Sequence, residues 1–394
     1  MLYLAKGGFW ITLGQGISTI AGLALAVGFA NLISKEVYGT YSFILSLAGV
    51  ISVLTLTGTR TAMTQAVARG FEGTLRASFW MSIRWSIFMV LAGFGGGLYY
   101  YLNGNIVLAL SLLIVGSCSP LMVSAALYSG FLNGKKEFRV GTVFNSVTNV
   151  LPAAALLSTI ALTDDILHII LVYFISNTAV NVYFYFRTLR MFKPNDKVDP
   201  TTDSYTKHLS FLNMLSTGAD YLDKILIFHY LGAAQLAVYA FAIAVPTHLR
   251  GLLRNVNSLI APKFAANDKN VVQKSLGEKM IKTALVSSLS VGLYIVAAPY
   301  LFKIFFPLYL DSIFYSQLFS LMIIPATVGI ISAAFLEAHK EQRALYITRI
   351  ASPIMRILLL VVFGYFWGIT GIIVGGIVAK TGMVVLTNIL AQRV

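Results

Sequence analysis

The sequence has little charge and almost no cysteine. Of its 394 residues, 11% are charged, only 15 are Asp or Glu, and Cys118 is the one cysteine. Soluble domains carry about 25% charged residues, so this composition cannot surround a core of this size with a polar surface. A single cysteine excludes a disulfide scaffold, and Cys118 lies in an apolar run, which predicts an inert buried thiol.

Sequence signatures of common enzymes are also missing. The chain has no HExxH zinc motif, no Walker A loop, no GxSxG nucleophile elbow and no Rossmann glycine pattern. The glycine-rich stretch at 93–97 lies within an apolar run, which is typical of a helix-packing surface rather than of a phosphate loop. The sequence therefore predicts no enzyme, no resident cofactor and no metal site.

Apolar residues are abundant. They make up 57% of the chain, and the mean hydropathy is +0.79. They form runs of about twenty residues, the length that an α-helix needs to cross a bilayer, and do not alternate as the strands of a membrane barrel would. The first run is too long for a signal peptide. We predict an all-α polytopic membrane protein of about twelve spans, at 9–33, 41–66, 78–102, 105–132, 142–163, 166–186, 209–231, 235–262, 280–305, 314–336, 346–367 and 369–391.

The loops between these runs alternate in basic charge. Lys35 and Lys303 are the only loop bases on one side of the predicted membrane, and every other loop Lys and Arg falls on the opposite side. The positive-inside rule places both termini in the cytoplasm. The net charge of +14 follows largely from this topology, and its dispersal over short loops argues against nucleic-acid binding.

The two halves of the chain show a weak internal repeat. A shift of 198 residues aligns Tyr41–Phe43 with Tyr239–Phe241, each at the start of the second span of a half. Six spans in each half give the halves the same orientation, related by a pseudo-twofold axis along the membrane normal. We predict an N-terminal lobe at 1–190, a cytoplasmic linker at 191–208 and a C-terminal lobe at 209–394. The linker is either a simple connector or a strap between lobes that rock.

Several bases lie inside the predicted spans, where a charge at the bilayer centre costs about 2.5–3.5 kcal/mol. They are Arg60, Arg84, Lys224, Arg250, Arg254, Arg349, Arg356 and Lys380. Arg250, Arg356 and Lys380 are too deep to reach the membrane surface easily, so we expect them to line an interior cavity. Arg60, Arg84, Arg254 and Arg349 lie nearer the ends of their spans and either line the cavity or extend to the membrane surface.

Polar residues recur at helical spacing beside these bases. Arg250, Arg254 and Asn257 follow one face of the eighth span, and Arg349, Ser352 and Arg356 follow one face of the eleventh. Asn145, Thr148 and Asn149 cluster on the fifth span, and Asn177 and Asn181 are four residues apart on the sixth. Such stripes on apolar helices are typical of the lining of a transport pathway.

Only two acids lie clearly inside the spans, and both are on the seventh. Asp220 is four residues before Lys224, so the two share a helix face, and Asp223 lies close by. The group is either a fixed structural ion pair or the site at which a proton or sodium ion is coupled to transport. Two acids cannot neutralise the bases, so the interior should keep a net positive charge.

Nearly the whole chain resembles a known family. The local similarity lies in KEVYGTYS at 35–42, VYAF at 238–241 and IAPKF at 260–264. With twelve spans in two halves and a cationic interior, the chain resembles the polysaccharide exporters of the multidrug/oligosaccharidyl-lipid/polysaccharide superfamily, and is most similar to Wzx-type O-antigen flippases. It lacks the two extra spans of the related lipid II flippase.

This resemblance implies a function. Members of the family carry undecaprenyl-pyrophosphate-linked oligosaccharide from the cytoplasmic to the periplasmic leaflet of the bacterial inner membrane, and a polysaccharide polymerase and a chain-length protein are expected partners. A cationic cavity suits an anionic pyrophosphate, which Arg can bind bidentately. The candidate substrate-binding residues are Arg250, Arg356, Lys380, Lys224, Arg254, Arg60 and Arg84, and the candidate coupling residues are Asp220 and Asp223.

Other functions remain open at this point. A multidrug exporter of the same superfamily often carries cationic cargo, which favours an acidic cavity. A membrane glycan polymerase or ligase usually has a large periplasmic loop, whereas the longest outer loop here is the short one at 306–313. A membrane scaffold would leave the buried bases without a role.

Overall fold

The computed structural model describes residues 2–254, 264, 269–339 and 341–393. Within these residues the secondary structure is helical and contains no strand, which confirms the predicted all-α class. Eight of the described helices are long and apolar enough to cross a membrane, so the chain is a multi-pass membrane protein. The last of these eight, α17, is long enough for two crossings.

The chain divides into two compact units, Met1–Tyr221 and Leu222–Val394. The boundary between them falls within helix α10 (Thr202–Leu231), and the lobes and the linker at 191–208 stay a prediction. The other helices of the first unit are α1 (Leu2–Leu32), α2 (Lys35–Ser52), α3 (Thr59–Ala68), α4 (Thr74–Trp85), α5 (Ile87–Leu102), α6 (Ile106–Ala125), α7 (Tyr128–Gly134), α8 (Phe138–Leu162) and α9 (Ile166–Phe192).

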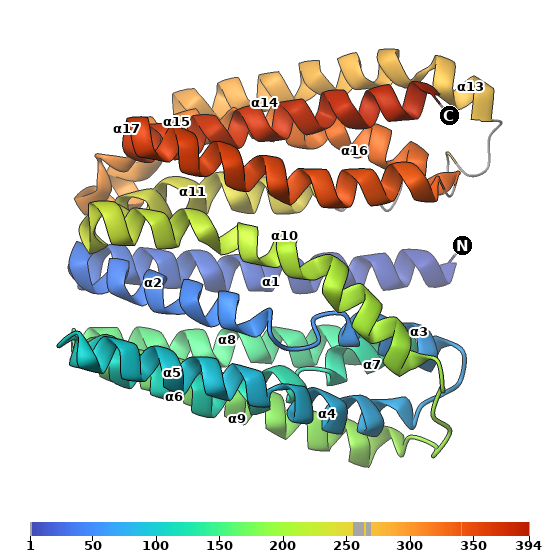
Figure 1. Cartoon of the computed structure of the whole chain (residues 1–394), viewed down its shortest axis with the longest axis horizontal. Coiled ribbons are helices and arrows are strands. Elements are labelled where there is room, and N and C mark those ends of the chain that lie inside the picture. Colours follow the sequence, from blue (N-terminus) through green and yellow to red (C-terminus); the bar gives the residue numbers. More distant parts are fainter. Residues whose placement is uncertain (1, 255–263, 265–268, 340, 394) are drawn as a thin grey trace. The chain divides into compact units, whose positions relative to one another are not determined.

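The first unit is a layered bundle of long helices. Helix α1 packs along α8, α5 packs along α6, and α9 lies between α6 and α8 (Figure 1). Glycines allow the closest approach, because a Cβ atom at Gly93 of α5 would come within 2.7 Å of the backbone of Gly116 on α6. The glycine-rich stretch therefore serves helix packing, as its position in an apolar run predicted.

The second unit contains α11 (Ala233–Arg254), α13 (Lys269–Lys274), α14 (Leu276–Phe305), the short 3₁₀ helix η1 (Pro307–Tyr309), α15 (Ser312–Ser320), α16 (Ile323–Ala338) and α17 (Gln342–Arg393). Helix α17 turns back on itself at Gly368, which adopts φ 56° and ψ −134°. Its two arms lie so close that a Cβ atom at Gly371 would be 1.9 Å from the carbonyl oxygen of Phe363. The turn lies at residue 368, between the last two predicted spans. Glycine suits this position, because it adopts a positive φ without strain.

The second predicted span, 41–66, is not one continuous helix. Helix α2 ends at Ser52 and α3 begins at Thr59. The hydroxyl of Thr55 donates to the Ser52 carbonyl at 2.7 Å, and that of Thr59 donates to the Leu56 carbonyl at 2.6 Å. Each of these carbonyls also accepts the backbone N–H of the same threonine, so local turns replace the helical hydrogen-bond pattern here. Gly58 allows the close approach of α10, since a Cβ atom there would be 2.6 Å from Leu209. This break sets the position of Arg60, in the first turn of α3.

The start of α2 and the start of α11 support the internal repeat. Helix α2 begins at Lys35 and α11 at Ala233, which are 198 positions apart in the numbering. The aligned side chains Phe43 and Phe241 are both buried in their own units, at 2% and 1% exposure. In the first unit Tyr41 stacks on Phe29 of α1 with 4.8 Å between ring centroids.

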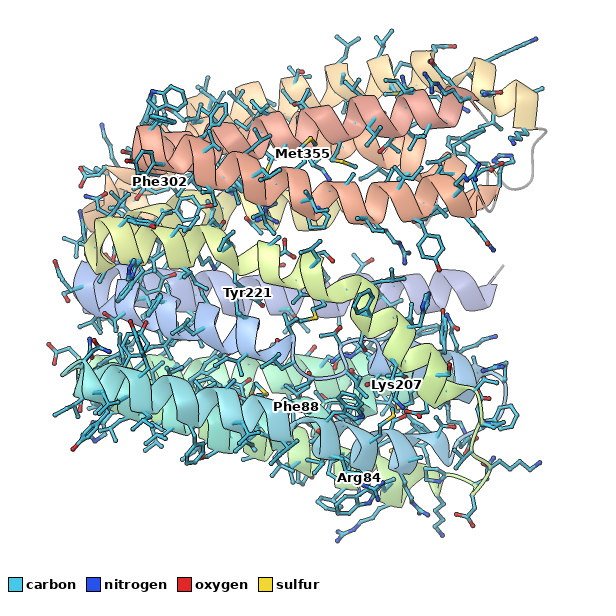
Figure 2. The ribbon with its side chains drawn as sticks, viewed as in Figure 1. Arg84, Phe88, Lys207, Tyr221, Phe302 and Met355 are labelled. Carbon is cyan, nitrogen blue, oxygen red and sulfur yellow. The ribbon has the colours of Figure 1, made fainter. Side chains whose placement is uncertain are left out.

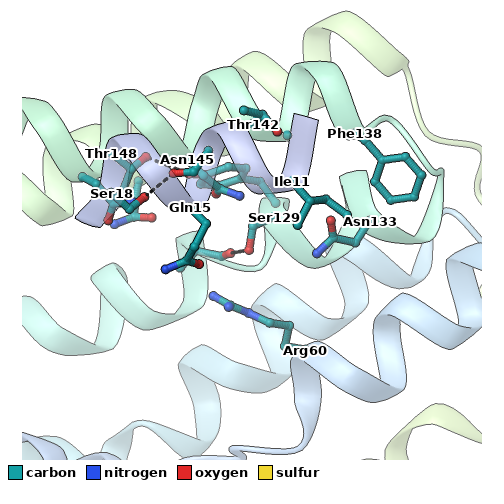
Figure 3. Close-up of a pocket in the computed structure, with 16 residues that line it drawn as sticks. Ile11, Gln15, Ser18, Arg60, Ser129, Asn133, Phe138, Thr142, Asn145 and Thr148 are labelled. Carbon is teal, nitrogen blue, oxygen red and sulfur yellow. Dashed lines mark hydrogen bonds between the residues drawn. The ribbon is translucent and has the colours of Figure 1, made fainter. Parts of the chain in front are cut away.

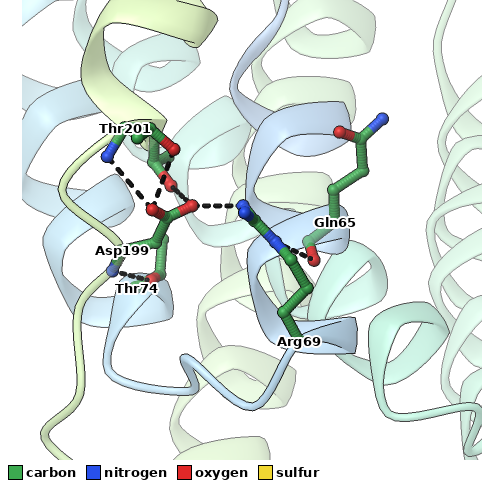
Figure 4. A network of polar contacts seen from close by, with 6 residues as sticks. Gln65, Arg69, Thr74, Asp199 and Thr201 are labelled. Atoms are coloured by element: carbon green, nitrogen blue, oxygen red, sulfur yellow. Dashed lines mark hydrogen bonds and ion pairs between the residues drawn. The ribbon is translucent and has the colours of Figure 1, made fainter.

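The segment between α9 and α10 is fixed to the first unit (Figure 4). Asp199 is buried, forms an ion pair with Arg69, and accepts hydrogen bonds from the backbone and side chain of Thr201 at 3.0 and 2.8 Å. The backbone N–H of Asp199 donates to the Thr74 hydroxyl at 3.1 Å. Nearby, Lys135 forms an ion pair with Glu72 at 2.6 Å. The contacts of Asp199 tie the segment to the ends of α3 and α4, and the Lys135–Glu72 pair joins the end of α7 to the loop between α3 and α4.

Candidate functional site

The first unit contains a polar cavity of about 590 Å³. Helices α1, α3, α7, α8 and α9 supply its walls, and no acidic side chain is among the described residues that line it. Its polar lining consists of Gln15, Ser18, Arg60, Tyr128, Ser129, Asn133, Thr142, Asn145, Thr148, Asn149 and Asn181. Amides and hydroxyls thus dominate the lining, with one guanidinium among them (Figure 3).

Two helices form the main wall. On α8, Asn145, Thr148 and Asn149 follow one helix face into the cavity, which is the stripe that the sequence indicated. On α1, Gln15 and Ser18 face the same space. The amide of Asn149 donates to the Ser18 hydroxyl at 2.7 Å, so the two stripes are joined across the helix interface.

Close packing holds these helices in register. The hydroxyl of Thr142 on α8 donates to the Trp10 carbonyl of α1 at 3.0 Å. Gly14 allows this contact, because a Cβ atom at that position would be 3.0 Å from the Thr142 methyl group. The Tyr128 hydroxyl of α7 is hydrogen-bonded to the Thr148 hydroxyl at 2.8 Å, which fixes the floor of the cavity to the same wall.

Arg60 supplies the positive charge of the cavity. It lies in the first turn of α3, and its guanidinium points toward Gln15 in Figure 3. Helix α3 is held against α7, because the Thr64 hydroxyl donates to the Gly130 carbonyl at 3.0 Å. Within the part of the chain that the structure describes, no carboxylate forms an ion pair with Arg60. An arginine that faces a polar cavity without a protein counter-ion is suited to bind an anion.

The two asparagines of the sixth predicted span have different positions. Asn181 lines the cavity and is buried, and its amide donates to the Asn177 carbonyl at 2.8 Å. Asn177 does not line the cavity, and its amide donates to the Tyr173 carbonyl at 2.9 Å. Of this predicted stripe, only Asn181 thus belongs to the site.

Part of the cavity lining was not predicted from the sequence. Gln15, Ser18, Ser129 and Asn133 line it, but they were not selected from the sequence. Gln15 and Ser18 are three residues apart in an otherwise apolar span, and this spacing could have identified them. Asn133 lies near the end of the short helix α7, and its position depends on the fold around it.

A second polar cluster lies in the second unit. Asp223 of α10 is buried, and its Oδ2 atom accepts a hydrogen bond from the Tyr239 hydroxyl of α11 at 2.6 Å. The same oxygen lies 3.9 Å from a guanidinium nitrogen of Arg356 on α17. Its Oδ1 atom accepts a hydrogen bond from the backbone N–H of Lys224 at 2.8 Å. Three helices of the second unit therefore meet at this one carboxylate.

The remaining predicted site residues are dispersed. Lys224 and Lys380 are half-buried in the second unit, whereas Asp220 is exposed in the first. Helix α11 runs through Arg250 and Arg254, but the side chains of both lie outside the described residues. Arg84 is exposed on α4 and does not line the polar cavity. Among the described residues, no group of three or more His, Cys, Asp or Glu side chains could hold a metal ion.

Comparison with known proteins places the chain in a family. The family model described as "Polysaccharide biosynthesis protein" matches residues 4–258, more than half of the chain. The chain belongs to the polysaccharide biosynthesis protein family. A search of curated proteins finds no match for this member of the family.

Solved structures show the same fold at low sequence identity. An inward-facing multidrug resistance MATE family transporter of the MOP superfamily matches with a TM-score of 0.71 and 12% identity, over 95% of this chain and 94% of that one. The lipid II flippase MurJ, in an inward closed conformation, matches with a TM-score of 0.67 and 14% identity, over 97% and 87% of the chains.

A third neighbour is a MOP superfamily transporter from Pyrococcus furiosus, whose description mentions a binding pocket of reverse polarity. It matches with a TM-score of 0.60 and 12% identity, over 100% of this chain and 93% of that one. At these identities the likeness shows the fold, which is that of MOP superfamily transporters. The predicted resemblance to polysaccharide-exporting proteins is confirmed at the level of the family, because the family model matches more than half of the chain.

Proposed function

We propose that this family member is a flippase that moves undecaprenyl-pyrophosphate-linked oligosaccharide, an O-antigen or related repeat unit, across the bacterial inner membrane. The observation that carries the proposal is Arg60, which faces a cavity of about 590 Å³ lined by amides and hydroxyls and has no ion-pair partner among the described residues. Family membership and the fold shared with a lipid II flippase agree with this proposal.

The chemistry of the cavity suits a glycan. Each Asn or Gln amide offers two donors and an acceptor, and each hydroxyl offers one donor and also accepts, so the lining can match sugar hydroxyls in many orientations. Arg60 adds a bidentate donor for a pyrophosphate or an acidic sugar. A cation would find no carboxylate among the described lining residues, so the multidrug exporter remains the weaker candidate.

The second unit would contribute the energy coupling. Asp223 is the buried carboxylate that joins α10, α11 and α17 through Tyr239 and Arg356. Binding of a proton or sodium ion at Asp223 would weaken its attraction for Arg356 and so bias the packing of these helices. Two states that differ in this contact are what alternating access requires. Asp220, which is exposed, is a less favourable candidate.

The test is flipping of a fluorescent lipid-linked oligosaccharide in proteoliposomes that contain purified protein. Arg60→Ala should lower the initial rate at least about tenfold, since a charge-assisted contact contributes about 1.5–3 kcal/mol. Arg60→Lys should keep part of the rate, because it retains the charge without the bidentate geometry. Lys303→Ala removes an exposed base far along the sequence and should flip at the parent rate. An unchanged rate in Arg60→Ala would exclude Arg60 as a substrate-binding residue.

A further inference from the structure

Arg84 lies on the outer face of α4. The inner face of this helix carries Ser78 and Ser82, and Ser86 follows its last residue; all three are buried. The hydroxyl of Ser124 on α6 donates to that of Ser82 at 2.8 Å. Arg84 is two residues from both Ser82 and Ser86, which places it about 200° around the helix from them. It is exposed, and its side chain extends away from the bundle (Figure 2).

The surroundings of Arg84 on this face are large and apolar. Trp80, four residues before it, is 60% exposed, and Phe88, four residues after it, is 49% exposed. Helices α4 and α5 together form the candidate span Thr74–Leu102, so this face is directed to lipid. Arg84 is therefore a base on the lipid-facing side of a membrane span, outside the polar cavity.

The depth of Arg84 follows from the length of the span. Tyr99, Tyr100 and Tyr101 near its far end form an aromatic group typical of the membrane interface. A hydrocarbon core of about 30 Å is crossed in about 20 residues, so the opposite interface falls near Trp80. Arg84 is one turn inside it. Helical side chains lean toward the N-terminus, which brings the guanidinium back to the level of Trp80, where lipid phosphates lie.

The charges around Arg84 favour an anion at this level. Within the described residues, no carboxylate forms an ion pair with Arg84. On the neighbouring Trp85, the ammonium of Lys207 lies 6.0 Å from the ring centroid, which adds a second base at the same side of the bundle. Lys207 pairs with Asp203 at 2.8 Å, so two bases share one nearby acid and the site keeps a positive charge.

We propose that Arg84, flanked by Trp80 and Trp85, binds the phosphate of an anionic phospholipid of the surrounding bilayer. Guanidinium binds phosphate oxygens bidentately, and the two indoles cover the adjoining glycerol and upper acyl region. Arg84 is then a lipid anchor of the first unit and takes no part in cargo binding, in contrast to its place among the substrate-binding candidates. This inference is independent of the proposed function.

The two tryptophans allow a direct test. The chain has four tryptophans, so the changes Trp10→Phe and Trp367→Phe leave Trp80 and Trp85 as the fluorescent reporters. The protein is reconstituted in phosphatidylcholine nanodiscs that contain an equal minor fraction of brominated phosphatidylglycerol or brominated phosphatidylcholine. Bromine quenches tryptophan only at contact, so the ratio of the two quenching strengths reports the preference for the anionic lipid.

We expect a preference of about fivefold for phosphatidylglycerol, the effect of one base at an anionic membrane surface. Arg84→Gln should reduce it toward equal quenching, Arg84→Lys should keep most of it, and the control Lys303→Gln should leave it unchanged. In the protein with Arg84 intact, added salt should also weaken the preference, and this readout does not depend on the folding of a variant. Equal quenching by both lipids, or a preference that survives Arg84→Gln or high salt, would overturn the proposal.

Discussion

The amide of Asn149 on α8 donates to the hydroxyl of Ser18 on α1 at 2.7 Å. This hydrogen bond joins two helices that are more than a hundred residues apart in the chain, and both side chains line the polar cavity. A substrate that enters the cavity therefore meets a wall whose polar groups are already oriented by one another. Such preorganisation lowers the entropy that binding must overcome.

The first prediction concerns this wall. Asn145→Ala and Asn181→Ala should each lower flipping of lipid-linked oligosaccharide about three- to tenfold, because each removes one neutral hydrogen-bonding partner of about 0.5–1.5 kcal/mol. Asn177→Ala is the matched control, since Asn177 is one turn from Asn181 but does not line the cavity. Equal losses in Asn181→Ala and Asn177→Ala would show that the amides act through the stability of α9 alone.

The second prediction concerns the carboxylate of the second unit. Asp223→Asn keeps the size of the side chain but removes its charge and its response to a proton or sodium ion. Flipping that an imposed ion gradient stimulates in the parent should lose that stimulation in the variant. Tyr239→Phe removes the 2.6 Å hydrogen bond and leaves the carboxylate, so its stimulation should persist. If Asp223→Asn responds to the gradient as the parent does, Asp223 is structural and the driving force lies elsewhere.

The third prediction concerns Asp199 and acid stability. Burial raises the pKa of Asp199, but hydrogen bonds from Thr201 and Thr202 and the charge of Arg69 outweigh burial, so the pKa lies below its usual 3.8. A carboxyl whose pKa is lower in the folded state stabilises the fold above the unfolded pKa, and loses that contribution as the pH falls through the folded value. Asp199 should therefore stabilise the first unit at neutral pH, begin to lose this contribution as the pH falls to about 3.8, and lose it fully below its lower folded pKa.

This effect is measurable by thermal denaturation in detergent. At pH 7, Asp199→Asn should lower the Tm by about 4–8 °C, which corresponds to a loss of about 2 kcal/mol. The difference from the parent should shrink when both proteins are melted at a pH well below 3.8. Asp196 is the control, because its ion pair with Arg76 is long, at 3.4 Å, and its side chain is 96% exposed. A Tm difference for Asp199→Asn that is the same at both pH values would contradict the assignment.

The fourth prediction concerns the turn in α17. Gly371→Ala should destabilise the second unit by about 3 kcal/mol or more, because the new methyl group would lie 1.9 Å from the Phe363 carbonyl oxygen. This oxygen belongs to the backbone of a helix, which cannot move aside as easily as a side chain. Gly292→Ala in α14 is the comparison, since no atom lies within 4 Å of a Cβ there. That variant should melt at the parent temperature or slightly above it. A Gly371→Ala protein as stable as the parent would exclude this close helix contact.

The fifth prediction concerns topology. The basic loops predict that reporter fusions near 135–140, 187–208 and 263–279 are cytoplasmic and that fusions near 164–165 and 306–313 are outside. Asp199 pairs with Arg69 and Lys135 pairs with Glu72, so the first two of these regions both contact the loop between α3 and α4. They therefore lie at the same end of the first unit, as two loops on one side of the membrane must. A periplasmic signal from the 187–208 fusion would invert the predicted orientation.

The sequence by itself determined the class of this protein. Long apolar runs can satisfy their backbone only as helices in a membrane, so an all-helical multi-pass fold follows from composition and run length. The stripe of Asn145, Thr148 and Asn149 was also visible, because helical spacing makes neighbours of residues three and four apart. The local similarity at 35–42 and the repeat indicated a resemblance to polysaccharide exporters, and the family model agrees with that family.

Tertiary structure decided which polar groups meet. The sequence ranked the intramembrane bases by depth, and Arg60 stood no higher than Arg84, yet Arg60 lines a cavity and Arg84 is exposed outside it. Periodicity within a helix gives only the relative directions of its own side chains. The break at 53–58 and the packing of α3 on α7 set the direction of Arg60, and the partner of Asp223 came from α17, more than 130 positions away. Contacts between distant segments depend on how helices pack, and no local pattern encodes that.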